Sequence, residues 1–149
     1  MKLAYFAAAA ALSVLATAAA AGSPDVYTGR FSDLAVGGYD PVAYFEEEKP
    51  VKGLKEFEFV HQGATWRFAS PDNLRRFMES PEAFAPQYGG YCAWAVAQGY
   101  TAPGNPKNWS VRAGKLYLNY DNGVQAKWLK DPEGFIKRAD ANWPAVLNK

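Results

Sequence analysis

The sequence predicts a small α+β protein in which a small antiparallel sheet of two hairpins packs against several short helices. Two stretches, residues 56–68 and 110–120, alternate apolar and polar side chains on either side of a tight turn, as hairpins do. Between and after them lie segments that begin with Ser-Pro or Asp and continue with apolar residues at helical spacing. The 149 residues include 49% hydrophobic and 15% aromatic residues, which suits one modest hydrophobic core.

The first 21 residues have the pattern of a secretory signal peptide. Lys2 precedes an unbroken, Ala-rich apolar run, and small residues precede Gly22. We therefore expect cleavage near Ala21 and an exported protein, periplasmic or secreted, with no membrane span after cleavage. The alternative is a retained membrane anchor, which is disfavoured because the run is rich in Ala and no basic cluster follows it. A flexible lead-in is predicted for residues 22–33 and a single domain for residues 34–149.

The first predicted element of this domain is a brief helix that follows a glycine-containing turn. Asp40 is a good N-cap, Pro41 suits the first helical position, where no amide hydrogen is needed, and Lys49-Pro50 ends the segment. The first hairpin comes next, with Gln62-Gly63 as its turn. Strand alternation places three side chains on one face of its first strand: Phe57, Phe59 and His61.

Two helices are predicted after this hairpin because a Ser-Pro pair suits a helix start. Ser80-Pro81 starts a short turn, and Ser70-Pro71 starts a longer helix whose apolar stripe is Leu74, Phe77 and Met78. A further helix is predicted over residues 91–98, closed by Gly99. The Pro- and Gly-rich residues 101–108 are predicted to form a loop.

The second predicted hairpin crosses Ala113-Gly114, with strands over residues 110–112 and 115–120. Asp121 and Asp131 are then placed to cap two final helices. Their apolar positions are Val124, Trp128 and Leu129 in the first, and Phe135, Ile136 and Ala139 in the second. After the signal segment we find no regular internal repeat and no low-complexity tract.

Charge and cysteine content exclude several classes of protein. Lys2 is the only charged residue of the predicted signal segment, so the remainder carries equal numbers of basic and acidic residues. This balance gives no basic surface for nucleic acid or for an anionic membrane, and we expect neither as a partner. The single cysteine, Cys92, forms no internal disulfide, so packing and hydrogen bonds must stabilise the fold.

Several short motifs follow one another between Tyr39 and Tyr88. They are Asp40-Pro41-Val42, a strand, Gly63, the aromatic pair Trp66 and Phe68 around Arg67, Ser70, a helix with Phe77, and the Ser-Pro-Glu-x-aromatic run from Ser80 to Phe84. The order and spacing of these motifs resemble those of the YHS domain family. The rest of the chain is similar to the longer, secreted form of that family found in bacteria. The resemblance implies an exported YHS-type α+β module.

The same resemblance bears on metal binding. Metal-associated YHS modules carry cysteines at three positions that correspond here to Ala43, Ala69 and Asn73. A zinc or copper(I) site needs three or four sulfur or imidazole ligands that converge on one point. Because all three cysteines are replaced, the metal function of those relatives is not carried over to this chain, and no cofactor is favoured.

Three interpretations of Cys92 stay open. The favoured one is structural, because a free cysteine on a small-residue helix face acts as a small buried apolar residue, here beside Ala95, Val96 and Gly99. The second is a copper or zinc site of Cys92 and His61 with an acidic group such as Asp40, in a periplasmic metal-handling protein. The third is a thiol enzyme in which His61 activates Cys92. His61 itself is interpreted as a structural residue bonded to a backbone carbonyl.

Aromatic and hydroxyl-bearing side chains are unusually dense, and a small neutral domain can hardly bury all of their polar atoms with partners. Some of them are therefore expected to line a ligand pocket where two glycine-containing turns converge. The candidate lining residues are Tyr39, Asp40, Tyr91, Cys92 and Trp94. The sequence thus predicts a binding or interaction module, not an enzyme, with an aromatic-lined pocket for an unknown small molecule or protein.

Overall fold

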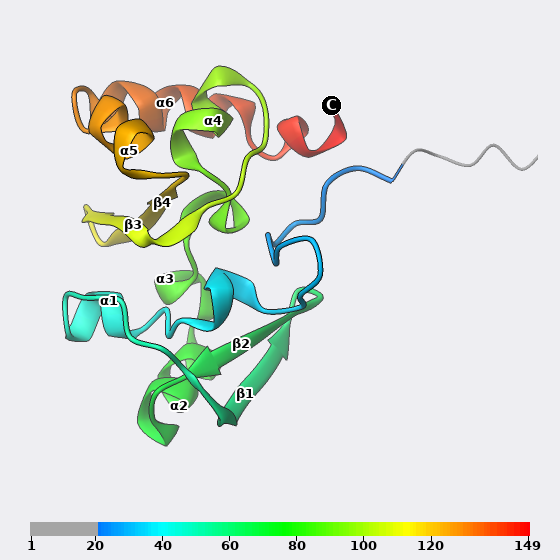
Figure 1. Cartoon of the computed structure of the whole chain (residues 1–149), viewed down its shortest axis with the longest axis vertical. Helices are drawn as coiled ribbons and strands as arrows, with labels where there is room; N and C mark the ends of the chain where they lie inside the picture. The colour runs from blue at the N-terminus through cyan, green and yellow to red at the C-terminus, as the bar shows by residue number, and fades with distance from the viewer. Residues whose placement is uncertain (1–20) are drawn as a thin grey trace, which may run out of the picture.

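Two stacked units of similar architecture make up the described part of the chain (Figure 1). The computed structural model describes residues 21–149, so the signal peptide predicted for residues 1–21 lies almost entirely outside the described residues. No helix within the described range is both long and apolar enough to cross a membrane. The predicted α+β class is confirmed, and the two hairpins form two separate two-stranded antiparallel sheets rather than one common sheet.

The first unit places one hairpin between short helices. Its elements are η1 (Ala35–Gly38), α1 (Ala43–Glu46), β1 (Leu54–His61), β2 (Ala64–Phe68), α2 (Pro71–Glu79) and α3 (Pro81–Phe84). The predicted alternation on β1 is confirmed by its burial pattern. Ser70 caps α2 as predicted, since its hydroxyl accepts a hydrogen bond from the Asn73 backbone N–H at 3.1 Å. Met78 departs from the predicted stripe and is 52% exposed, because the side of α2 that carries Phe77 faces the core.

The second unit repeats this order. Its elements are η2 (Gln87–Gly90), α4 (Ala93–Gln98), β3 (Asn105–Arg112), β4 (Lys115–Asn119), α5 (Asn122–Trp128) and α6 (Pro132–Asn142), followed by η3 (Ala145–Asn148). Gly99 closes α4 in the left-handed conformation, and Asp121 and Asp131 cap the last two helices, all as predicted. The loop predicted over residues 101–108 is wrong in its second half, because Asn105 pairs with Asn119 across a register shift and starts β3 early.

The correspondence between the units extends to unusual backbone angles. In η1, Val36, Gly37 and Gly38 have φ values of 53°, 59° and 81°; in η2, Tyr88, Gly89 and Gly90 have 57°, 60° and 82°. The hairpin turns match as well, with φ of 50° and 74° at Gln62-Gly63 and 48° and 73° at Ala113-Gly114. Left-handed angles at non-glycine residues are uncommon, so this coincidence indicates one unit built twice.

This finding corrects the prediction that the sequence holds no internal repeat. A constant shift of the numbering relates the hairpins and the helices after them, so that residue 61 corresponds to 112, 70 to 121 and 82 to 133. The repeat was missed because its most constant features are turn glycines and helix caps. Buried side chains differ between the units, as where Asp40 in one corresponds to Cys92 in the other.

Each unit has its own cluster of buried apolar side chains, and β4 joins the two. The rings of Trp66 and Phe77 lie 4.8 Å apart in the first cluster, and the corresponding rings of Tyr117 and Trp128 lie 5.5 Å apart in the second. Leu118 of β4 belongs to the first cluster and its neighbour Tyr117 to the second. Side chains alternate across a strand, so β4 contributes to both cores at once.

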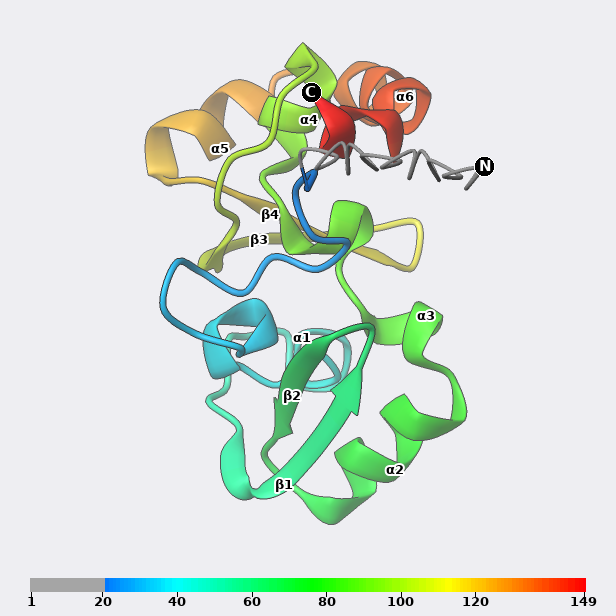
Figure 2. The same ribbon diagram turned by 90° about the vertical axis from the view of Figure 1, so that its right-hand side faces the viewer.

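Residues 22–33, predicted to be a flexible lead-in, are instead bonded to the second unit in their first half. The Ser23 N–H donates to the Leu147 carbonyl at 2.7 Å, and the Tyr27 N–H donates to the Gly89 carbonyl at 2.9 Å. Val26 is 4% exposed. The partners of this segment lie far along the chain, so local sequence gives no signal of these contacts. The segment runs along both units (Figure 2).

Candidate functional site

Asp40 is a fully buried carboxylate held by hydrogen-bond donors at the start of α1. Its Oδ1 accepts from the backbone N–H of Val42 at 2.8 Å and of Ala43 at 3.4 Å. Its Oδ2 accepts from the Ala69 N–H at 2.8 Å and from Asn73 Nδ2 at 2.7 Å. The side chain is 0% exposed, so Asp40 acts as a structural anion that starts the helix and not as part of a pocket wall.

Ala43, Ala69 and Asn73, which the resemblance aligns with the cysteines of metal-associated YHS modules, all donate to this carboxylate. Ala43 and Ala69 supply backbone N–H groups, and Asn73 supplies its side-chain amide. Zinc and copper(I) sites require several thiolate or imidazole ligands. The residues present do not fit such an ion, because the alanine side chains have no ligand atom and the Asn73 amide nitrogen donates to Asp40.

Cys92 is buried in a comparable cage in the second unit. It is 1% exposed, and its Sγ lies 3.6 Å from Asn119 Oδ1. Burial raises the pKa of the Cys92 thiol, and hydrogen bonds from the backbone of Ala95, Tyr120 and Trp94 partly oppose that rise. A thiol with a raised pKa is a poor nucleophile at neutral pH. The geometry therefore agrees with the structural interpretation of Cys92.

The cages around Asp40 and Cys92 are equivalent. The donors around the carboxylate come from residues 42, 43 and 69, and those around the thiol come from the corresponding residues 94, 95 and 120. In the second unit Asn119 reaches the cage and accepts a hydrogen bond from the Trp94 N–H at 3.1 Å, while its own Nδ2 is buried without a partner among residues 21–149. A carboxylate uses this cage more completely than a thiol does.

His61 and Cys92, the predicted alternative metal pair, occupy different units. The His61 ring lies at the end of β1, 5.9 Å from the ring of Phe59 and 6.0 Å from that of Phe77. Its backbone carbonyl accepts a hydrogen bond from Trp66 Nε1 at 3.1 Å. Residues 21–149 contain no group of three His, Cys, Asp or Glu side chains arranged to hold a metal ion. Each residue is thus packed in its own unit, His61 among aromatic rings and Cys92 beside Asn119.

The remaining predicted pocket residues, Tyr39, Tyr91 and Trp94, have packing roles. Tyr91 is 5% exposed, and its hydroxyl donates to the Pro24 carbonyl at 2.9 Å. Tyr39 packs on the first core cluster, and Lys127 Nζ lies 5.5 Å from the centre of a Trp94 ring. Two cavities among residues 21–149, each beside one of the hairpins, are lined by other residues.

The first cavity, crevice A, has a volume of about 500 Å³ and lies where the two units meet. The end of β1 and the start of α3, which are neighbours in Figure 2, form one wall. The lead-in and the segment after α6 form the other, at Asp25 and Trp143-Pro144. The residues that define its chemistry are Trp66, Tyr88 and Trp143 among the rings, and His61, Glu82 and Gln87 among the polar groups.

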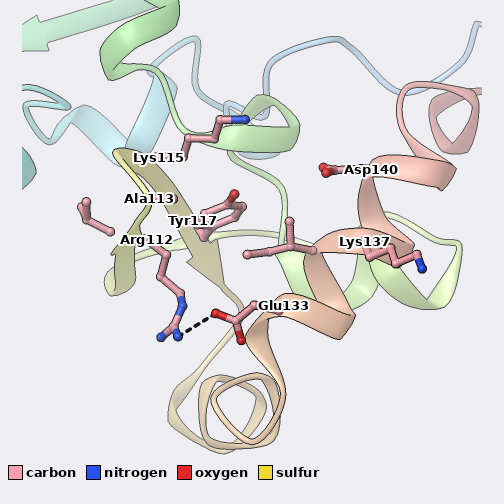
Figure 3. A pocket seen from close by; sticks show the side chains of 9 residues that line it. Arg112, Ala113, Lys115, Tyr117, Glu133, Lys137 and Asp140 are labelled. Carbon is pink, nitrogen blue, oxygen red and sulfur yellow. Dashed lines mark hydrogen bonds and ion pairs between the residues drawn. The ribbon is translucent and has the colours of Figure 1, made fainter.

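The second cavity, crevice B, has a volume of about 670 Å³ and lies between the β3–β4 hairpin and α6 (Figure 3). Arg112 Nη2 forms an ion pair with Glu133 Oε1 at 3.0 Å. The Tyr117 hydroxyl is directed toward the side of the crevice where Lys115 and Asp140 lie. Burial, and then the charge of Asp140, raise the pKa of Tyr117, so its hydroxyl is a donor at neutral pH.

Crevices A and B are the same feature built twice. Their matched positions are His61 with Arg112, Gln62 with Ala113, Trp66 with Tyr117, Glu82 with Glu133, Ala85 with Ile136, and Pro86 with Lys137. In each unit the crevice lies between the end of the hairpin and the second helix after it. Tyr88 separates the two crevices, because its ring lines crevice A while its hydroxyl donates to Asp140 of crevice B at 2.8 Å.

Sequence reasoning missed both crevices because it missed the repeat. The signal that could have found them is the pair of matching runs Ser80–Phe84 and Asp131–Phe135, each with Pro, Glu and Phe at the same spacing. No family model matches the chain, and neither a curated protein nor a solved structure does. The candidate site therefore stands on the geometry of this chain.

Proposed function

We propose that the protein is an exported, non-catalytic binding module of the YHS type that holds a small ligand in crevice A. The observation that carries the proposal is the construction of that crevice. Four separate parts of the chain surround about 500 Å³, with aromatic walls and a few polar groups at the rim. Ligand sites in proteins are concavities of about 300–1,000 Å³ with this mixture of apolar wall and convergent polar groups.

The YHS part of the proposal has its own support. The three positions that carry cysteine in metal-associated relatives are separated in the sequence, and all three meet at Asp40. If this chain shares the scaffold of the family, the three positions of the family's metal site should lie close together, as they do here. With alanine at two of these positions and asparagine at the third, the scaffold has no soft metal ligands there, which favours a binding role elsewhere on the module.

The walls of crevice A favour a planar, neutral ligand with hydrogen-bonding edges. Trp66 and Tyr88 are nearly buried, so each presents a limited part of its ring, whereas Trp143 is half-buried and offers more surface for stacking. His61 and Glu82 also line the crevice. The His61 ring can donate or accept a hydrogen bond, and the Glu82 carboxylate can accept one. An aromatic heterocycle with an N–H group fits this combination.

Titration calorimetry with indole and benzimidazole tests the proposal. We expect both probes to bind, and His61→Gln and Glu82→Gln each to weaken binding about two- to tenfold, the effect of one hydrogen bond. Glu56→Gln, at an exposed position on β1 outside the crevice, is the matched control and should leave binding unchanged. Absence of binding by either heterocycle, or equal loss in the control variant, would contradict the proposal.

A further inference from the structure

Crevice B differs from crevice A in charge, although the two share one construction. Three matched positions change from neutral or titratable residues to permanent cations: His61 to Arg112, Ala64 to Lys115, and Pro86 to Lys137. The acidic residue at position 82 is kept at position 133. The second copy of the crevice has therefore gained positive charge at its rim, while its floor has stayed apolar through Tyr117 and Ile136.

The acidic groups of crevice B already have partners within the protein. Glu133 Oε1 is paired with Arg112 at 3.0 Å, and Asp140 Oδ1 accepts the hydroxyl hydrogen of Tyr88 at 2.8 Å. Lys115 and Lys137 belong to no ion pair among residues 21–149. Lys115 lies on the hairpin and Lys137 on α6, and the Lys137 side chain extends away from the hairpin (Figure 3). Asp140 likewise belongs to no ion pair among residues 21–149, so the unpaired charges at this site are two positive and one negative, a net charge of +1.

We propose that crevice B binds a small organic anion, an apolar body that bears a carboxylate or a phosphate group. The unpaired ammonium groups of Lys115 and Lys137 attract the anionic group electrostatically, and the Tyr117 hydroxyl is a hydrogen-bond donor within the crevice. Ile136 and Val111 cover the apolar body. Exposed lysines contribute a factor of about two to five each at low salt, so binding combines both contacts and weakens as salt rises.

The test is a titration of the ¹⁵N-labelled protein, followed by amide chemical shifts. Benzoate, phenyl phosphate and inorganic phosphate are the anionic probes, and benzamide is the neutral probe with the shape of benzoate. We expect benzoate or phenyl phosphate to shift the amides of Ala113, Ile136 and Lys137, and benzamide to bind at least fivefold more weakly. The preferred head group follows from comparing benzoate with phenyl phosphate, and preference for either supports the proposal.

Variants separate the site from general surface charge. Lys115→Met with Lys137→Met should weaken benzoate binding at least fivefold, whereas Lys55→Met with Lys130→Met, at exposed positions outside the crevice, should not change it. Glu133→Gln should strengthen binding about threefold, because it releases Arg112.

Three results would overturn the proposal: equal binding of benzamide, unchanged binding in the Lys115/Lys137 double variant, or unchanged binding of unmodified protein between 20 and 500 mM salt. The salt series needs no variant and keeps the test decisive if a variant fails to fold. Indole binding in crevice A uses other residues, so the proposed function and this inference succeed or fail separately.

Discussion

Replacement of Asp40 by alanine should destabilise the protein strongly without touching either crevice. The carboxylate is 0% exposed and accepts three hydrogen bonds of 2.7–2.8 Å and a fourth of 3.4 Å. Asp40→Ala removes the acceptor of three close donors, one buried and two partly buried, and a donor left without a partner costs up to about 1–3 kcal/mol. Part of that loss is offset, because folding of the alanine variant no longer has to transfer a charged carboxylate from water to the protein interior. We expect the free energy of unfolding to fall by about 3–4 kcal/mol, a large fraction of the 5–15 kcal/mol typical of a domain.

Urea unfolding at pH 7, followed by tryptophan fluorescence and circular dichroism, measures this change. Asp33→Ala is the control, because Asp33 is exposed and its carboxylate accepts one hydrogen bond, from Thr65 Oγ1 at 2.9 Å; its loss should stay below about 1 kcal/mol. Asn73→Ala should lower stability by an intermediate amount, and its effect should largely vanish in the Asp40→Ala background. A loss below about 1 kcal/mol in Asp40→Ala would refute the cage as a source of stability.

Three further predictions concern the second unit and the buried hydroxyls. Gly104→Ala should cost more than about 2 kcal/mol in urea unfolding, because its Cβ would collide with the Gly90 carbonyl of η2. Gly123→Ala in α5 should be neutral or stabilising, because its Cβ would lie 3.5 Å from the nearest atom, Asp121 Oδ1. Cys92→Asp should cost less stability than Cys92→Leu, since a carboxylate can use the cage and the unpartnered Asn119 amide; the opposite order would refute the equivalence of the two cages. Burial raises the pKa of Tyr44 in the folded state, so the unfolded state loses its proton first as pH rises, and the free energy of unfolding should fall above about pH 10. Urea unfolding midpoints measured from pH 8 to 11 report this fall, which should be smaller in Tyr44→Phe.

Local features of the fold could be predicted from the sequence because their causes are local. The hairpin turn at Gln62-Gly63 needs left-handed backbone angles, and Asp121 and Asp131 each satisfy an N–H of the helix that they begin. The start of β3 was missed because Asn105 is a strand residue only through its pairing with Asn119, across a register shift. Long-range pairing of this kind leaves no trace in a short window of sequence.

The residues of the predicted pocket have packing partners that the sequence does not display. Many tyrosine hydroxyls were expected to lack buried partners, yet backbone carbonyls distant in sequence accept hydrogen bonds from two of them. The Tyr44 hydroxyl donates to the Pro106 carbonyl at 2.6 Å, and the Tyr91 hydroxyl donates to the Pro24 carbonyl at 2.9 Å. Rings that were expected at a binding surface are therefore satisfied within the fold, and the crevices form at the ends of the hairpins instead.

One titration tests the central claim, that a repeated unit carries two equivalent crevices of different chemistry. Indole and benzoate are added in turn to the same ¹⁵N-labelled sample. We expect indole to shift the amides of Gln62 and Gln87 in crevice A, and benzoate to shift those of Ala113 and Lys137 in crevice B. If both probes shift the same set of amides, or if neither shifts any of these four, the two-crevice account is wrong.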